Sequence, residues 1–309
     1  MTRRGRRGRD AGPILMAVAL CGVLLAGCVA EGGEKQPAAG IRERVARSGQ
    51  SAASAGPASR SFYMGMPPGA YDLTDQAVED TYRFLGAHAD LVAHHLGQGV
   101  PWPEAFEKRP YQSNVKKELT VRMRHLTSTQ RTYVAIQLAT EGGLTGYWGK
   151  DEQMERPGKW KEKAIDDPEV VTAYLNYARD LIARFHPDFF NYAIEANMLV
   201  KNKTGWPQFV NAARKIYTTL KSEHPQLPVF FSIQIDELWK DPTQQRDSLR
   251  QVWAYTDFVA VSSYPYVYGY FDPKTIPRRY LSTLPPSRRR SRLRSRRPGS
   301  SQKISTRWA

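Results

Sequence analysis

The stretch Asp188-Phe189-Phe190-Asn191-Tyr192-Ala193-Ile194-Glu195-Ala196-Asn197-Met198-Leu199 is a short apolar run that ends in a carboxylate and a carboxamide. In an enclosed parallel sheet a strand is apolar on both faces, and polar residues at its carboxyl end usually lie where ligands bind. The pattern therefore predicts the fourth strand of a (β/α) barrel, with Glu195 as the first candidate for a catalytic residue. The alternative interpretation is a buried Glu that is neutralised by a neighbouring Arg or Lys.

On both sides of this stretch, short apolar segments alternate with segments of helical periodicity. The expected strands are 62–66, 91–95, 132–138, 228–235 and 258–264, and the expected helices include 114–126, 206–222 and 249–255. The clearest helix follows Asp167, which is a suitable cap, and has Pro168 in its first turn. Strict alternation predicts an α/β fold with a parallel sheet and right-handed crossovers.

About six such units favour a (β/α)8 TIM-type barrel, incomplete at its C-terminal end, and disfavour a small doubly wound sheet. The segment after the first expected strand, Gly65-Met66-Pro67-Pro68-Gly69, lacks the glycine-rich dinucleotide fingerprint. We therefore expect no nucleotide cofactor.

In such a barrel the strand ends gather polar side chains on one face. Asp236 is the candidate for a second catalytic carboxylate, and the residues expected to contact a substrate there are His94, His95, Gln137, Glu141, Asn197, Glu237 and Tyr264. Adjacent His94 and His95 point to opposite sides of a strand and cannot chelate one ion together, so no metal site is expected. One histidine is expected to face the barrel mouth, although a packed or surface position fits the pattern equally well.

Trp102, Trp148 and Trp160 lie in segments that are expected to be loops on the same side of the barrel. Flat aromatic rings near carboxylates suit sugars, whose C–H faces are apolar and whose hydroxyl groups need acceptors. Loop tryptophans can equally be lids over the core.

With these features, Ser61 to Tyr268 resembles the large clan of (β/α)8 glycoside hydrolases, and the endo-galactanase-like branch is the nearest comparison. The resemblance implies an acid/base Glu after strand four, which Glu195 matches, and a nucleophilic Glu after strand seven. The clan's usual order places Asn directly before Glu, whereas here Ala196 separates Glu195 from Asn197. A register in which Asn197 takes the acid/base position, with catalysis lost, is therefore open.

No seventh strand with a terminal Glu is visible, so Asp236 is the remaining partner for a two-carboxylate mechanism. The resemblance implies a glycoside-hydrolase-like protein that acts on or binds a polysaccharide or oligosaccharide. The alternatives are a carbohydrate-binding or cell-envelope lipoprotein without turnover, and an inactive truncated product.

The N-terminal region has the features of an exported lipoprotein. Residues 1–27 combine an arginine-rich start with an uncharged run, as in a signal peptide, and Leu25-Ala26-Gly27-Cys28 resembles the bacterial lipobox. That resemblance implies cleavage before Cys28 and lipidation of its sulfur; an ordinary signal peptide with a free Cys is the alternative. Residues 28–60 have almost no large apolar side chains and are expected to form a flexible tether. Val29 instead of Asp favours an outer-membrane position in the cell envelope, facing away from the cytoplasm, if the host has such a membrane.

The C-terminal residues 285–309 carry nine basic residues and no acidic residue, so much of the net charge of +15 lies there and in the five Arg of the first 27 residues. A nucleic-acid partner fits an exported lipoprotein poorly, and we expect a monomer. An Arg run beside Ser and Pro is what GC-rich codons give in the wrong frame. We therefore expect 285–309 to be disordered or out of frame and 61–284 to be an incomplete barrel, which resequencing of the gene would test.

Overall fold

The computed structural model describes residues 62–278 and 280. The expected signal peptide, lipidation site Cys28, tether and basic tail lie outside these residues and stay predictions. Contacts group the described chain into a small unit, residues 69–81, and a large unit that contains 62–68 and 82–280. Within the described part, no helix is long and apolar enough to cross a membrane.

The small unit contains the start of helix α2 (Asp75–His88). The hydroxyl group of Thr74 accepts a hydrogen bond from the backbone N–H of Ala77 at 3.2 Å, which satisfies a donor that the first helical turn leaves unpaired. Tyr71 donates to Asp80 at 3.0 Å within the same unit. Thr74 is thus the cap of this helix.

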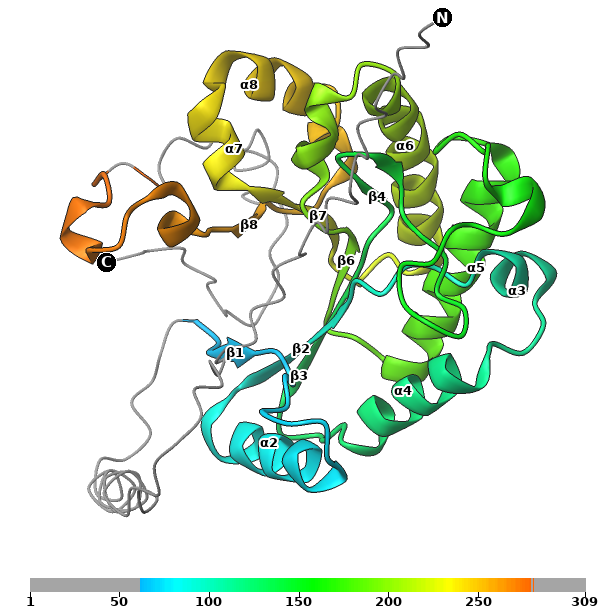
Figure 1. Cartoon of the computed structure of the whole chain (residues 1–309), viewed down its shortest axis with the longest axis vertical. Helices are drawn as coiled ribbons and strands as arrows, with labels where there is room; N and C mark the ends of the chain where they lie inside the picture. The colour runs from blue at the N-terminus through cyan, green and yellow to red at the C-terminus, as the bar shows by residue number, and fades with distance from the viewer. Residues whose placement is uncertain (1–61, 279, 281–309) are drawn as a thin grey trace, which may run out of the picture. The chain divides into compact units, whose positions relative to one another are not determined.

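The large unit is built on a six-stranded parallel sheet (Figure 1). Its strands follow the order of the chain: β1 (Gly65–Met66), β2 (Leu91–Leu96), β3 (Arg131–Ile136), β6 (Phe189–Ala193), β7 (Val229–Gln234) and β8 (Ala260–Ser262). A doubly wound sheet reverses its strand order at a switch point, whereas this sheet adds each new strand to the same edge. The fold is therefore α/β, with six neighbouring strands of a curled (β/α) barrel.

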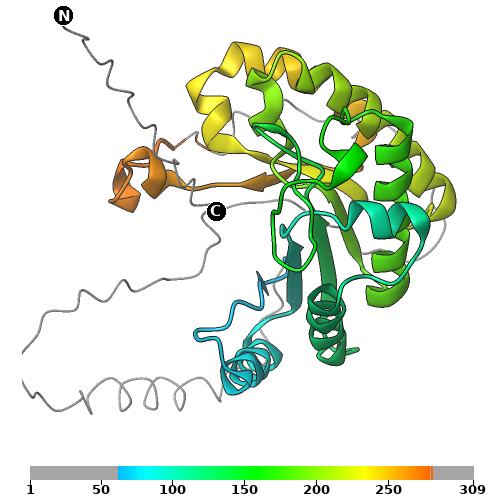
Figure 2. The same cartoon turned by 45° about the vertical axis from the view of Figure 1, so that its right-hand side comes forward.

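Helices lie on one face of the curled sheet, as the two views in Figure 1 and Figure 2 show. The connections carry α3 (Trp102–Glu107), α4 (Ser113–Arg124), α5 (Pro168–Phe185), α6 (Gly205–Glu223), α7 (Ile235–Lys240) and α8 (Pro242–Arg250), a small hairpin of β4 (Ala139–Thr140) and β5 (Gly143–Leu144), and the 3₁₀ turns η1 (Gly158–Trp160), η2 (Ala196–Lys201), η3 (Trp253–Tyr255), η4 (Pro265–Tyr268) and η5 (Pro273–Thr275). The main hydrophobic core lies between these helices and the sheet.

Helix α5 illustrates how the sequence forms these elements. The carboxylate of Asp167 accepts from the backbone N–H of Glu169 at 2.8 Å, and Pro168 occupies the first turn, where its missing N–H is not needed. The apolar stripe along the helix is buried against the sheet. The prediction for this helix is confirmed.

The segment after β7 differs from the expectation of a helix at 249–255. Helix α8 begins at Pro242, where Asp241 accepts from the backbone N–H of Gln244 at 3.0 Å, and η3 is a separate turn. Leu249 is the apolar residue that α8 buries, so hydrophobic periodicity gave no signal for its first turns. The cap and the following proline were the available signal.

Candidate active site at the strand ends

Glu195 lies two residues beyond the end of β6 in an unusual backbone conformation. Its φ of 47° and ψ of 42° are left-handed, which Gly, Asn and Asp adopt more readily than Glu. Such a conformation costs about 1–3 kcal/mol and persists where surrounding contacts enforce it. Here the backbone N–H of Glu195 donates to the hydroxyl group of Ser232 in β7 at 2.9 Å.

The carboxylate of Glu195 is half-buried and held by two hydroxyl groups. Its Oε1 accepts from Ser262 Oγ at 2.5 Å and from Tyr264 Oη at 2.8 Å. Within residues 62–278, the other oxygen Oε2 makes no hydrogen bond, and no Arg or Lys pairs with this carboxylate. The interpretation of Glu195 as a Glu neutralised by a cation is therefore wrong for the described chain.

A polar layer lies beneath Glu195 on the inner face of the sheet. Asn191 is fully buried and donates to Tyr133 Oη at 2.9 Å and to Ser232 Oγ at 3.1 Å. Ser232 thus links this layer to the backbone of Glu195. This layer was not predicted from the sequence, although an Asn inside an apolar strand is a visible signal.

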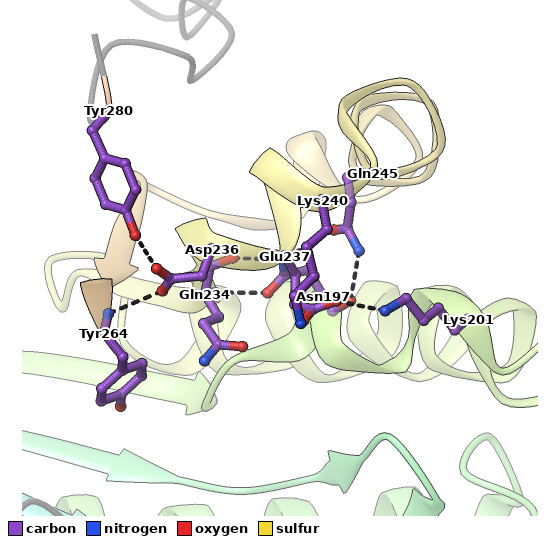
Figure 3. Close-up of polar contacts among 9 residues, drawn as sticks. All are labelled: Asn197, Lys201, Gln234, Asp236, Glu237, Lys240, Gln245, Tyr264 and Tyr280. Atoms are coloured by element: carbon purple, nitrogen blue, oxygen red, sulfur yellow. Dashed lines mark hydrogen bonds and ion pairs between the residues drawn. The ribbon is translucent and has the colours of Figure 1, made fainter. Parts of the chain in front are cut away.

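Asp236, the expected second carboxylate, is enclosed and only 2% exposed (Figure 3). Its Oδ2 accepts from the backbone N–H of Tyr264 at 2.9 Å, and its Oδ1 accepts from the hydroxyl group of Tyr280. Burial raises the pKa of Asp236, and the negative charges of Glu195 and Glu237 act in the same direction. Asp236 therefore holds Tyr264, whose hydroxyl group contacts Glu195, and does not face the barrel mouth as an open carboxylate.

Glu237 belongs to an ion-pair cluster with two lysines (Figure 3). Its carboxylate pairs with Lys201 at 2.8 Å and with Lys240 at 2.7 Å. Burial alone would raise the pKa of Glu237, but the hydrogen bonds and charges of the two lysines outweigh it and lower the pKa below its usual range. The cluster connects η2 to α7, so Glu237 contributes to structure here instead of lining the mouth as expected.

Asn197 is also a structural residue. Its side chain is fully buried, donates to Gln234 O and Gln245 Oε1, both at 2.9 Å, and accepts from Gln234 N at 2.7 Å. These three hydrogen bonds connect η2 to β7 and α8. The register in which Asn197 takes the acid/base position is not the observed one.

The two histidines of β2 point to opposite faces of the sheet, as predicted. The ring of His94 is 1% exposed, packs 5.0 Å from the ring of Phe185 in α5 and faces the helices. Burial is the main cause that lowers the pKa of His94 to about 3. His95 faces the inside of the barrel; burial lowers its pKa, whereas the negative charge of Glu195 acts to raise it.

The other polar candidates lie around the mouth. Gln137 Oε1 accepts from Gln153 Nε2 at 3.3 Å. Glu141 is exposed at the turn between β4 and β5, and its backbone carbonyl accepts from Asn202. Tyr264 is the candidate that contacts Glu195 directly.

The tryptophan rings are not open platforms. Trp102 and Trp148 are 0% and 2% exposed, and Trp160 is 3% exposed. Trp102 begins α3, stacks 6.0 Å from Trp160 and donates its Nε1–H to Thr145 O and Gly146 O. The expectation that Trp102 and Trp148 offer their faces to a sugar is therefore corrected: Trp102 lies in α3 and stacks on Tyr174 of α5, and Trp148 is buried in the same core.

The assembled site is a half-buried carboxylate with one engaged and one available oxygen. Such a group can exchange a proton with a ligand and can accept hydrogen bonds from hydroxyl groups. Across the described residues, no cluster of three or more His, Cys, Asp or Glu could hold a metal ion.

No family model and no curated protein sequence matches the chain. Solved structures with some likeness include the Ignisphaera aggregans GH53 catalytic domain, at 16% identity and a TM-score of 0.43, covering 68% of this chain and 62% of that one. A structure of fungal β-1,4-galactanases has 14% identity and a TM-score of 0.39, covering 60% of this chain and 55% of that one. The chain thus spans less than two thirds of the length of these structures. The chemistry of the site rests on the contacts described above.

Proposed function

We propose that this protein is a glycoside-hydrolase-like barrel that binds a polysaccharide against Glu195 and uses this carboxyl group as a general acid/base. The observation that carries the proposal is the state of Glu195: it follows the fourth barrel strand, it is held in a strained conformation, and its Oε2 is available to a ligand. In glycoside hydrolysis, a group of this kind protonates the oxygen of the leaving sugar.

Tyr264 and Ser262 are positioning residues in this proposal. Their hydroxyl groups hold Oε1, and Oε2 makes no hydrogen bond within the described residues. Tyr264 is itself held through its backbone N–H by Asp236. The orientation of Glu195 thus depends on contacts from β7 and β8, which supports a role in a fixed reaction geometry.

A second candidate function is carbohydrate binding without turnover. Glycoside hydrolysis by either common stereochemical route uses two carboxyl groups beside the scissile bond. The enclosure of Asp236 favours this second candidate, because a carboxylate that is 2% exposed cannot reach a sugar in the observed conformation.

Two measurements on the full chain separate the two candidates: release of reducing ends from a panel of neutral and acidic polysaccharides, and binding of the same polysaccharides. If Glu195 is the general acid/base, Glu195→Gln should lower hydrolysis by about 100-fold or more while binding is kept. Glu118→Gln, at a partly exposed carboxylate of helix α4 that pairs with Arg122, is the matched control and should leave hydrolysis unchanged.

Binding without hydrolysis in the wild type would select the second candidate. A wild-type chain that neither binds nor hydrolyses any polysaccharide of the panel would refute the proposal.

We also propose that the mature protein is anchored through a lipid on Cys28 and lies at the bacterial cell envelope, facing away from the cytoplasm. The sequence features of residues 1–27 support this part of the proposal. Mass spectrometry of the mature N-terminal peptide should show Cys28 as the first residue with diacylglycerol on its sulfur. An unmodified Cys28 would exclude the anchor.

A further inference from the structure

Gln234 is the last residue of β7 and lies on the inner face of the sheet. Successive side chains of a strand alternate between the faces, so Phe230, Ser232 and Gln234 share one face. Phe230 packs against the ring of Tyr133, and Ser232 contacts both Asn191 and the backbone of Glu195. Gln234 therefore lies one layer nearer the mouth than Ser232.

The strand register places Gln234 beside the residues that hold Glu195. Gln234 is the register partner of Ser262 in β8, and Ser262 donates to Glu195 Oε1. The side chains of Gln234 and Tyr264 extend to the same side in Figure 3. The amide group of Gln234 thus belongs to the layer of the candidate active site.

The side-chain amide of Gln234 has no hydrogen bond within residues 62–278. It is 8% exposed, its Oε1 is enclosed without a partner, and it does not cap α7 although it occupies the capping position. Its main chain is fixed, because Asn197 accepts from its N–H and donates to its carbonyl. A buried amide without hydrogen-bond partners lowers the stability of the fold. In a native structure such a group usually has a specific explanation, and one explanation is that it binds a ligand.

Of the two polar atoms of this amide, Oε1 is the one that is fully enclosed. Half a turn about the last side-chain bond exchanges Oε1 and Nε2 without moving any carbon atom. The amide can therefore present either a donor or an acceptor to the mouth. A sugar hydroxyl group, which both donates and accepts, matches either orientation.

We propose that Gln234 is a specificity-determining residue that hydrogen-bonds one hydroxyl group of a neutral sugar ring bound against Glu195. This inference rests on the proposed function. A neutral ring is favoured over a uronic acid because the carboxylate of Glu195 would repel a second carboxylate. The lysines of the adjoining segments, Lys201 and Lys240, are directed to Glu237 and do not offset that charge at the mouth.

The test measures binding of methyl β-galactoside, methyl β-glucoside and methyl β-mannoside, their monodeoxy derivatives and methyl β-glucuronide to the full chain. Removing the hydroxyl group that Gln234 contacts should weaken wild-type binding about tenfold, which corresponds to one neutral hydrogen bond. The Gln234→Leu variant should bind the parent glycoside more weakly by a similar factor. It should also bind the parent glycoside and the monodeoxy derivative that lacks the contacted hydroxyl group equally well. Gln251→Leu, at an exposed glutamine, is the control and should keep the wild-type preference.

Gln234→Met, an unbranched side chain of the same length, is the second variant if Gln234→Leu does not fold; thermal unfolding of each variant is recorded first. If Gln234→Leu or Gln234→Met keeps the full preference for the parent glycoside, the inference is wrong although the proposed function stands. Tighter binding of the glucuronide than of every neutral glycoside would also overturn the inference. If the wild type binds neither these glycosides nor any polysaccharide, the inference and the proposed function fail together.

Discussion

Glu195 combines a strained backbone with a carboxylate that is only partly engaged, and both properties are needed for the proposed chemistry. The left-handed conformation turns the chain sharply after β6, and the bond from its N–H to Ser232 fixes that turn. Residues kept in such conformations at the expense of stability are frequent at functional sites. This strained conformation marks Glu195 as a functional candidate independently of the order of residues along the chain.

Relieving the left-handed conformation at position 195 should stabilise the fold when the side-chain contacts are removed equally. Glu195→Gly and Glu195→Ala both lose the bonds to Ser262 and Tyr264 and should both be inactive, but Gly adopts this conformation without a steric cost. The free energy of unfolding of Glu195→Gly should therefore exceed that of Glu195→Ala by about 1 kcal/mol. Urea unfolding measures both variants; a lower stability of Glu195→Gly than of Glu195→Ala would show that the backbone is not under strain.

His94 makes the stability of the folded chain sensitive to acid. Burial and the positive charge of Arg122 lower its folded-state pKa to about 3, from an ordinary value of 6.5. The unfolded chain therefore binds a proton at pH values where the folded chain does not. The stabilisation that depends on neutral His94 is fully present above about pH 6.5. As the pH falls from about 6.5 towards about 3, the free energy of unfolding should decrease by an amount on the order of a few kcal/mol.

His94→Leu should remove this part of the pH dependence, because Leu fills the apolar site and does not titrate. Chemical unfolding at several pH values between 3 and 7 measures the difference between the wild type and the variant. His88→Leu, at an exposed histidine near the end of α2, should leave the pH dependence unchanged. A parallel loss of stability in wild type and His94→Leu would contradict the assignment.

At the scale of elements, the side chain of Asn197 fixes the short turn η2 to two of its neighbours. Asn197 connects η2 with the end of β7, and Gln245 of α8 completes the contact by donating to the Asn197 carbonyl. Because η2 directly follows Glu195, these bonds also fix the segment that carries the site.

Asn197→Ala should therefore act mainly through stability. It leaves a buried backbone N–H and carbonyl of Gln234 without their partner, which should lower the free energy of unfolding by about 1–3 kcal/mol. Asn211→Ala, on the exposed face of α6, is the control. Unchanged stability together with complete loss of activity would instead indicate a direct role of Asn197 in catalysis.

The predictions for elements were accurate where local signals were strong. Helix α5 has a cap, a proline at its start and a long apolar stripe, and all three were visible in the sequence. Helix α3 and the first turns of α8 were not predicted, since α3 has only six residues and α8 buries little apolar surface. Short or polar helices depend on tertiary contacts more than on periodicity.

At the scale of the large unit, exposed aromatic rings lie beside the starts of several strands. Tyr63 is 51% exposed and Phe258 is 39% exposed, and both pack against Phe189 at ring distances of 6.3 Å. Within the described residues, β1 and β8 each pair with one neighbour and end the sheet. Open edges beside apolar surface favour association between chains.

In place of the monomer expected from the sequence, we therefore expect concentration-dependent self-association of the full chain. Phe258→Ser should reduce it, because the substitution removes an exposed apolar ring next to the edge strand β8. Leu73→Ser, at an exposed leucine of the small unit, is the control with a similar change in hydrophobicity. Sedimentation velocity over a range of concentrations measures the effect, and a wild-type chain that stays monomeric throughout would contradict this prediction.

The sequence by itself determined the strand and helix alternation, the α/β class and the position of Glu195 after the fourth strand of the barrel, because periodicity, caps and strand-end polarity are local patterns. The tertiary structure alone decided which residues meet Glu195. Ser262 and Tyr264 lie 67 and 69 residues further along the chain, and only the pairing of β7 with β8 brings them to its carboxylate. The burial of Trp102 and Asp236 could likewise not be predicted from the sequence. Their exposure depends on segments that fold over them from distant parts of the chain, and no local sequence pattern encodes such contacts.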